Sequence, residues 1–184
     1  MTPPASSRSG PQPFQSPIGV LFVCLGNICR SPLAEGVFVH LARQRGVLER
    51  FRVDSCGTGD WHSGELADPR SRAVARKHGI ELTHRARVLS PDDDFQPAPW
   101  GRGFHWLIGM DRQNCRRMTA LGAPPERVRL LRSFDPLLAG RSEAELEVPD
   151  PYSEPDEAFD EVYAMVERAC AGMLDELLKE SRGA

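Results

Sequence analysis

The stretch that decides the fold is Ile18–Glu35, which reads IGVLFVCLGNICRSPLAE. Its first six residues, 18–23, are mostly apolar and β-branched, a pattern typical of a buried strand. Ser31, followed by Pro32 and then by Glu35, indicates the start of a helix, with Ser31 near the N-cap and Pro32 in the first turn. The residues from Cys24 to Arg30 therefore form a loop between a strand and a helix.

Strand and helix patterns alternate along the rest of the chain. Strands are predicted at 51–54, 104–108 and 128–131, and helices from Ser31 to about Gly46 and at 68–77, 111–121 and 159–177. This alternation predicts an α/β fold, a single three-layer domain with a four-stranded parallel sheet flanked by helices on both faces. Such sheets bind ligands at the carboxyl ends of their strands, where the Cys24 loop lies. The Asp-, Pro- and Gly-rich segment 90–103 is predicted to be an exposed loop.

Length and composition limit the classes of protein. A chain of 184 residues suits one domain. Residues 1–17 are rich in Pro, Ser, Gly and Gln, which predicts a disordered N-terminal extension before a domain at 18–180. The net charge of -3 gives no sign of nucleic acid or an anionic membrane as partner. No apolar run approaches the roughly 20 residues that cross a bilayer.

The five cysteines, an odd number, are scattered along the chain. This arrangement does not resemble a secreted disulfide framework, so a reducing cytoplasm is the expected location.

The loop from Cys24 to Arg30 has the composition of an anion site. Its backbone N–H groups can converge on one point, and the N-terminus of the following helix adds a positive dipole. Arg30 supplies a planar fork for two phosphate oxygens, and Asn27 tolerates a left-handed backbone. The same groups favour the thiolate of Cys24, the form that attacks phosphorus. Taken alone, Cys24 is more simply a buried structural cysteine; the spacing of its neighbours favours catalysis without a metal or another cofactor.

A proton donor is predicted near the other end of the chain. Asp150 stands between Pro149 and Pro151, which stiffen the backbone, and next to the ring of Tyr152. A carboxyl group held beside an aromatic ring suits protonation of an aryl leaving group. By itself, an Asp-Pro pair is more simply interpreted as a turn. The catalytic interpretation is favoured only because the same chain also contains the Cys24 loop.

With these motifs in view, the chain resembles the low-molecular-weight protein tyrosine phosphatases from Ile18 to about Leu178. The resemblance is carried by the following residues: 23–32, 54–55, Trp61, 78–80, 84–87, 110–111, 133–136 and 150–152. It implies a phosphatase that forms a cysteinyl-phosphate, with Cys24 as nucleophile, Arg30 as phosphate clamp and Asp150 as general acid and later base. Its expected substrates are tyrosine-phosphorylated proteins or small aryl phosphates, and its expected state is a monomer or weak dimer.

The resemblance also assigns supporting roles. Ser31 would hydrogen-bond the sulfur of Cys24, and a network would hold the loop in shape. Network and loop-supporting residues are Asn27, Ser31, Ser55 and His84; phosphate-binding residues are Cys24, Leu25, Gly26, Asn27, Ile28, Cys29 and Arg30; pocket walls are Leu25, Ile28, Trp61 and Tyr152. Cys29 is implied as a redox partner that forms a disulfide with Cys24 under oxidation, although a small residue packing the loop is an equal alternative.

Two departures from the family pattern stand out. Ser153 occupies a position where many members have a second aromatic residue, and an insertion at about 92–103, with Trp100, is followed by His105 in place of an acidic residue. These differences bear on the choice of partner rather than on the chemistry.

Three other functions compete with a tyrosine phosphatase. Related arginine phosphatases carry threonine at the position of Ile28, so the isoleucine favours tyrosine. An arsenate reductase needs a relay of cysteines, and Cys56, Cys115 and Cys170 show no close pair in the sequence. A phosphotyrosine-binding module without activity would be expected to lack Cys24 or Asp150, and both are present.

Overall fold

The fold is built on a sheet of four parallel strands, as the alternating pattern predicts. The computed structural model describes residues 17–96 and 101–183. The strand order is β2-β1-β3-β4, and each neighbouring pair is parallel. The strands are β1 (Ile18–Cys24), β2 (Phe51–Gly57), β3 (Trp106–Gly109) and β4 (Val128–Leu130).

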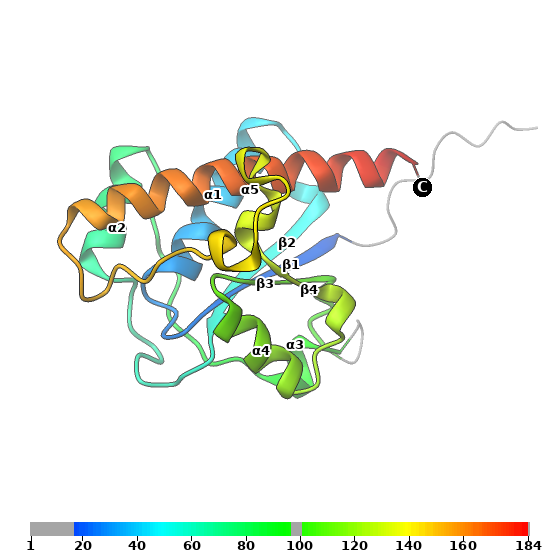
Figure 1. Cartoon of the computed structure of the whole chain (residues 1–184), viewed down its shortest axis with the longest axis horizontal. Coiled ribbons are helices and arrows are strands. Elements are labelled where there is room, and N and C mark those ends of the chain that lie inside the picture. The colour runs from blue at the N-terminus through cyan, green and yellow to red at the C-terminus, as the bar shows by residue number, and fades with distance from the viewer. Residues whose placement is uncertain (1–16, 97–100, 184) are drawn as a thin grey trace, which may run out of the picture.

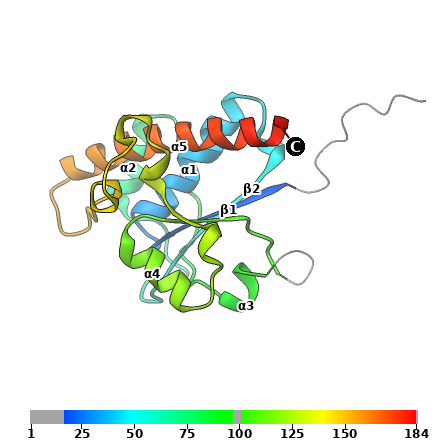
Figure 2. The ribbon, with the colours of Figure 1, turned by 45° about the vertical axis from the view of Figure 1, so that its right-hand side comes forward.

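Helices cover both faces of this sheet, so the three-layer architecture is confirmed (Figures 1 and 2). One face is covered by α1 (Arg30–Gln44), α2 (Pro69–Lys77) and α5 (Glu157–Gly183), and the other by α3 (Pro91–Asp94) and α4 (Arg112–Ala120). Short 3-10 helices occupy Leu48–Arg50, Pro125–Arg127, Leu131–Phe134, Pro136–Leu138 and Glu143–Leu146. No described helix is both long and apolar enough to cross a membrane.

The pleat of β1 divides its side chains between two cores. Phe22 packs with the layer of α1 and α5, whereas Leu21 and Val23 pack with the layer of α4. All three side chains are fully buried. Because both faces of β1 are covered, its sequence is continuously apolar, as is typical of a central parallel strand. This burial fixes the strand end that carries Cys24.

Several predicted boundaries are wrong. Strand β2 continues past residue 54 to Gly57, because it pairs with β1 as far as Cys24. Strand β3 runs over 106–109 rather than 104–108. The segment 90–103 is not simply an exposed loop: its part at Pro91–Asp94 forms α3, and Asp94 and Phe95 are buried.

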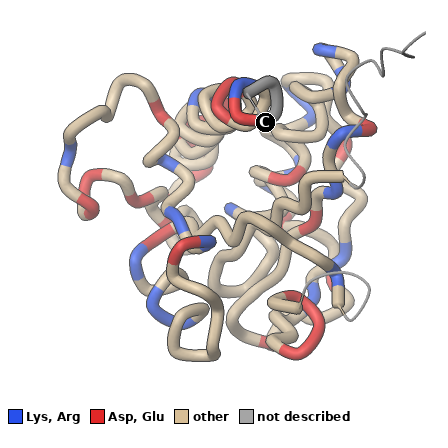
Figure 3. Tube along the Cα trace, turned by 90° about the vertical axis from the view of Figure 1, so that its right-hand side faces the viewer, with Lys and Arg blue, Asp and Glu red and all other residues tan. Residues whose placement is uncertain are grey.

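Two other predictions fall largely outside the described residues. The predicted disordered extension, residues 1–17, lies outside them except for Pro17, and residues 97–100 of the predicted insertion, Trp100 included, lie outside them as well. In the part of the chain that the structure describes, basic and acidic residues are interspersed along the trace (Figure 3), which agrees with the small net charge.

Candidate active site

The loop that follows β1 turns tightly into α1. Cys24 ends the strand, and Arg30 is already the first residue of the helix, with Cys29 at the N-cap. Asn27 has a φ of 56°, the left-handed backbone that the sequence predicts for it. The prediction that Ser31 lies near the N-cap is wrong by two positions. Cys29 at the N-cap makes no side-chain capping hydrogen bond, and the hydroxyl of Ser31 lies 3.0 Å from the sulfur of Cys24.

The sulfur of Cys24 is surrounded by hydrogen-bonding groups. Its Sγ lies 3.0 Å from the hydroxyl oxygen of Ser31 and accepts a hydrogen bond of 3.2 Å from the backbone N–H of Asn27. The residue is only 2 % exposed. These contacts hold the sulfur in one position at the floor of the loop.

The side chain of Asn27 is the centre of the network that holds the loop. Its amide nitrogen donates to the hydroxyls of Ser31 and Ser55, each at 2.9 Å. Its carbonyl oxygen accepts from the backbone N–H of Arg87 at 2.9 Å and lies 3.0 Å from Nε2 of His84. Because an amide oxygen only accepts, Nε2 of His84 carries the hydrogen. The structure thus brings the four predicted loop-supporting residues together; their functional roles stay predictions.

The guanidinium of Arg30 lies in the same site, and both of its terminal nitrogens are hydrogen-bonded to neighbouring residues. Its Nη1 donates to Asp111 at 2.7 Å and to the carbonyl of Val148 at 3.1 Å, and its Nη2 donates to Asp150 at 2.6 Å. Its Nε is buried and has no partner among the described residues. A buried N–H group without a partner is costly, so this atom is suited to donate to an anion in the pocket.

A pocket of about 150 Å³ joins Cys24, Arg30 and Asp150. Ile28 is largely buried, whereas Leu25, Trp61 and Tyr152 are 41 %, 68 % and 51 % exposed and form the walls of its mouth. The lining is Cys24, Leu25, Gly26, Ile28, Cys29, Arg30, Trp61, His62, Asp150 and Tyr152. All four predicted wall residues therefore lie around the predicted catalytic group.

Two residues of this site had no role in the sequence analysis. His62 lines the pocket, with its ring 6.3 Å from that of Tyr152, and Asp111 binds Arg30. A signal for His62 was its place directly after Trp61 in the Gly-rich loop. Asp111 belonged to the Met110-Asp111 pair that carries the family resemblance, but nothing in the sequence linked it to Arg30.

Asp150 lies in a loop fixed at both ends. The N–H of Val148 donates to the carbonyl of Met110 at 2.7 Å, and the guanidinium of Arg70 donates to the carbonyl of Tyr152 at 2.9 Å. The side chain of Asp150 is 42 % exposed, the most open of the predicted catalytic groups. Its carboxylate can therefore face both Arg30 and a ligand in the pocket.

Cys29 differs from Cys24 in its surroundings. Burial, followed by the charges of Asp68, Cys24 and Asp150, raises the pKa of the Cys29 thiol from 9.0 to about 12. The Cys29 thiol therefore stays protonated at neutral pH. All five cysteines are free in this structure, and the disulfide between Cys24 and Cys29 stays a prediction.

The described residues also form a second cavity and a cluster of possible metal ligands. A cavity of about 380 Å³, lined by parts of α4 and β4, contains none of the predicted catalytic residues. Glu35, Asp54 and His84 bring one polar atom each within 4.8 Å of the others. Ser55 donates hydrogen bonds to both carboxylates of this group, and we assign no metal to it.

Comparisons with known proteins agree with this geometry. The family model described as low molecular weight phosphotyrosine protein phosphatase matches residues 19–183. A low molecular weight protein-tyrosine-phosphatase from Streptomyces coelicolor is 43 % identical, with 89 % of this chain and 96 % of that protein covered. The low molecular weight protein-tyrosine phosphatase A of Mycobacterium tuberculosis is 41 % identical, with 88 % and 93 % covered.

Solved structures show the same fold. YfkJ from Bacillus subtilis superposes with a TM-score of 0.79 at 32 % identity, over 91 % of this chain and 99 % of that one. An arginine phosphatase from Drosophila superposes with a TM-score of 0.73 at 29 % sequence identity, over 86 % of this chain and 96 % of that one. On its sequence and its fold, this chain belongs to the low molecular weight phosphotyrosine protein phosphatase family.

Proposed function

We propose that this enzyme hydrolyses phosphotyrosine through a cysteinyl-phosphate intermediate formed on Cys24. The observation that carries the proposal is the pairing of two groups in one pocket: a sulfur that accepts from Asn27 and lies against the Ser31 hydroxyl, and a guanidinium whose buried Nε lacks a described partner. The first group suits attack on phosphorus, and the second suits binding of its oxygens. Alignment of the sulfur with the phosphorus atom and stabilisation of the transition-state charge supply most of what phosphoryl transfer requires.

In the first step, the Cys24 thiolate attacks the phosphorus atom and the bond to the tyrosyl oxygen breaks. The backbone N–H groups of the loop and Arg30 hold the phosphoryl oxygens. A phosphate oxygen competes with Asp150 for the same Nη2 hydrogen of Arg30, which now binds the carboxylate at 2.6 Å. Phosphate binding therefore displaces the carboxylate of Asp150 from Arg30. Asp150 then takes up a proton from solvent beside the bound phosphate and gives it to the leaving phenolate oxygen.

In the second step, water attacks the phosphorus of the intermediate and the bond to sulfur breaks. Asp150, now ionised, accepts a proton from this water, and inorganic phosphate and the Cys24 thiolate are regenerated. The hydroxyl of Ser31, 3.0 Å from the sulfur, stabilises the thiolate as a leaving group. The same carboxyl group serves as acid and then as base, so no cofactor enters the sequence.

The walls of the pocket favour a flat ring over a guanidinium group. Ile28 is apolar and 8 % exposed near the floor, and the rings of Trp61 and Tyr152 stand at the mouth. An apolar wall offers no acceptor for the N–H groups of phosphoarginine, whereas it packs against the face of a tyrosine ring. Arginine phosphatase activity is the alternative, since a Drosophila arginine phosphatase shares the fold.

An arsenate reductase is supported less. Burial raises the pKa of the thiols of Cys56, Cys115 and Cys170, which disfavours the thiolates that a relay of disulfides needs. We take the substrates to be tyrosine-phosphorylated proteins or small aryl phosphates. A cytoplasmic location, which the free cysteines favour, and a monomeric or weakly dimeric state belong to the same proposal.

The test compares phosphotyrosine and phosphoarginine peptides as substrates of one purified sample. Faster release of phosphate from phosphotyrosine supports the proposal, and faster release from phosphoarginine overturns its specificity. Cys24→Ser is expected to abolish turnover and to retain phosphate binding, because the loop amides and Arg30 remain. Alkylation of Cys24 by iodoacetate that neither phosphate nor vanadate slows would argue against the nucleophile.

A further inference from the structure

Behind the nucleophile loop lies a buried carboxylate, Asp94, which the predicted chemistry does not use. Its side chain is 0 % exposed. Its two oxygens accept a pair of hydrogen bonds from the guanidinium of Arg87, at 2.9 and 3.0 Å, and one of them also accepts from the N–H of Ser90 at 2.8 Å. A buried charge is tolerated only when it is paired and hydrogen-bonded in this way. The pair therefore holds both side chains in one geometry.

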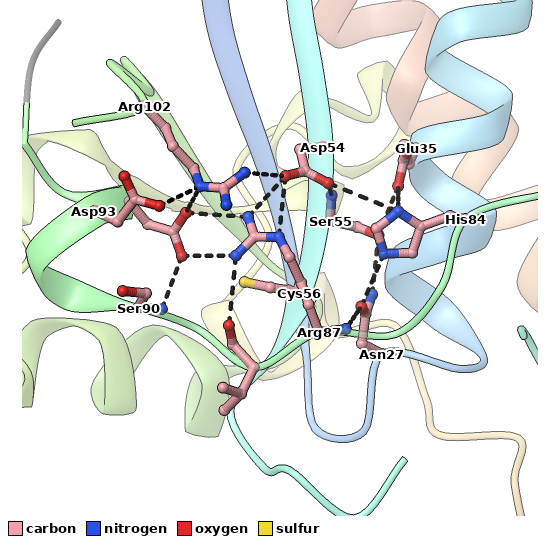
Figure 4. Close-up of polar contacts among 12 residues, drawn as sticks. Asn27, Glu35, Asp54, Ser55, Cys56, His84, Arg87, Ser90, Asp93 and Arg102 are labelled. Atoms are coloured by element: carbon pink, nitrogen blue, oxygen red, sulfur yellow. Dashed lines mark hydrogen bonds and ion pairs between the residues drawn. The ribbon is translucent and has the colours of Figure 1, made fainter. Parts of the chain in front are cut away.

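The other edge of the Arg87 guanidinium is bound as well. Its Nε and Nη2 contact one oxygen of Asp54, at 3.0 and 2.8 Å. Figure 4 shows the guanidinium of Arg87 lying between Asp54 and the segment that carries Ser90 and Asp93. Because carboxylates bind it on two sides, the side chain of Arg87 has little freedom to turn.

The backbone of Arg87 is directly bound to the nucleophile loop. Its N–H donates to the side-chain oxygen of Asn27 at 2.9 Å, and its carbonyl accepts from the N–H of Gly57 at 2.8 Å. Asn27 in turn donates its own backbone N–H to the sulfur of Cys24. Three contacts thus connect Asp94 to the nucleophile, through Arg87 and Asn27.

A second branch reaches the same asparagine. Asp54 accepts the N–H of Ser55 at 2.8 Å on the oxygen that does not contact Arg87. The hydroxyl of Ser55 accepts from the amide nitrogen of Asn27 at 2.9 Å (Figure 4). The position of Arg87 is therefore transmitted to Asn27 along two routes, and Asn27 has the left-handed backbone on which the shape of the loop depends.

We propose that Asp94 and Arg87 are positioning residues of the phosphatase reaction, which hold Asn27 and thereby the N–H groups that face the Cys24 sulfur and the phosphate. Neither residue lines the pocket, so both act through Asn27. The inference rests on the proposed function. It assigns a catalytic consequence to α3, which lies on the opposite face of the sheet from α1.

The principal test is Asp94→Asn, which keeps the shape of the side chain and removes its charge. We expect kcat/KM for an aryl phosphate to fall by about 2- to 30-fold, the range of couplings transmitted through such networks. The inhibition constant of vanadate is expected to rise by a similar factor, because the oxyanion uses the same N–H groups. The matched control is Asp93→Asn, the same substitution at the preceding residue, whose exposed carboxylate contacts Arg102.

A loss of packing alone would lower the denaturation midpoint and leave the vanadate constant of the folded enzyme unchanged. That result, or an Asp94→Asn enzyme equal to the Asp93→Asn control, overturns the inference and leaves the phosphatase function intact. Absence of turnover in the unmodified enzyme would instead contradict the proposed function.

If Asp94→Asn does not fold, Arg87→Lys provides the test. Lysine keeps the positive charge between the carboxylates and cannot form the paired hydrogen bonds. We expect kcat/KM to fall and the vanadate constant to rise in that variant too. Unchanged values would refute the positioning role.

Discussion

Asp150 is bound to Arg30 and partly open to solvent, and its predicted role depends on the substrate. Asp150→Ala is expected to lower kcat by about 10²–10⁴ for phosphotyrosine, whose leaving oxygen needs a proton. For an activated ester such as p-nitrophenyl phosphate the decrease is expected to be much smaller, because its phenolate leaves unaided. Steady-state kinetics on both substrates measure the difference.

The control is Asp156→Ala, an exposed carboxylate in the segment just before α5. An equal loss on both substrates in Asp150→Ala would assign Asp150 to binding rather than to proton donation.

The backbone conformation of single residues could be predicted from the sequence where few residue types adopt that conformation. A left-handed backbone at Asn27 and the end of the first helix near Gly46, whose φ is 65°, both follow from conformational preference. The local pattern placed Ser31 near the N-cap of the first helix, and its contact with the Cys24 sulfur was predicted only from the family resemblance. A serine before proline has the same local signature in both cases, and only the tertiary position of Cys24 decides between them.

At the scale of the element, the end of β2 packs directly against the backbone of the loop that follows Cys24. A Cβ on Gly57 would lie 2.8 Å from the carbonyl oxygen of Leu25 and 3.1 Å from the backbone nitrogen of Asn27. Gly57→Ala must therefore displace the loop, at a cost of about 1–3 kcal/mol in stability. We expect kcat/KM to fall by up to about 10²-fold, since small misplacements of catalytic groups are that costly.

Phosphatase assays and urea denaturation of Gly57→Ala check both effects. Ser63→Ala, at an exposed position of the same connection, is the comparison and should behave as the unmodified enzyme. Normal activity in Gly57→Ala would show that the loop does not depend on this close approach.

The elements themselves were predictable where periodicity is strong and less so where a charge is buried. The central strand and α5 were placed correctly because their apolar patterns are long. The short helix α3 was missed, since three successive aspartates indicate an exposed turn unless a partner is known. The partner of Asp94 is Arg87, and no local sequence pattern predicts that ion pair.

For the molecule as a whole, one partly buried carboxyl group, that of Glu35, links stability to pH. Burial raises the pKa of Glu35 from 4.5 to about 7; a hydrogen bond from Ser55 opposes the rise, and the charge of Asp54 adds to it. The folded state thus binds this proton more tightly than the unfolded chain does. The contribution of Glu35 to the free energy of unfolding should decrease as pH rises from about 4.5 to 7, because the unfolded chain releases this proton while the folded state keeps it.

Glu35→Gln, which is neutral throughout, should remove this contribution, so that the variant gains stability relative to the unmodified enzyme as pH rises. Urea midpoints measured across that range give the difference, with Glu49→Gln, at an exposed position, as reference. Parallel curves for Glu35→Gln and the unmodified enzyme would mean that the pKa of Glu35 is the same in the folded and unfolded states.

The ion pair between Asp150 and Arg30 has one more consequence, for the end of the catalytic cycle. In the proposed mechanism, inorganic phosphate occupies, after hydrolysis, the position from which the carboxylate was displaced. The return of that carboxylate to the guanidinium expels the product, so the enzyme contains its own competitor for the anion site. In the proposed mechanism, inhibition by phosphate should therefore be weaker than it would be without Asp150, the side chain also proposed to assist the leaving group.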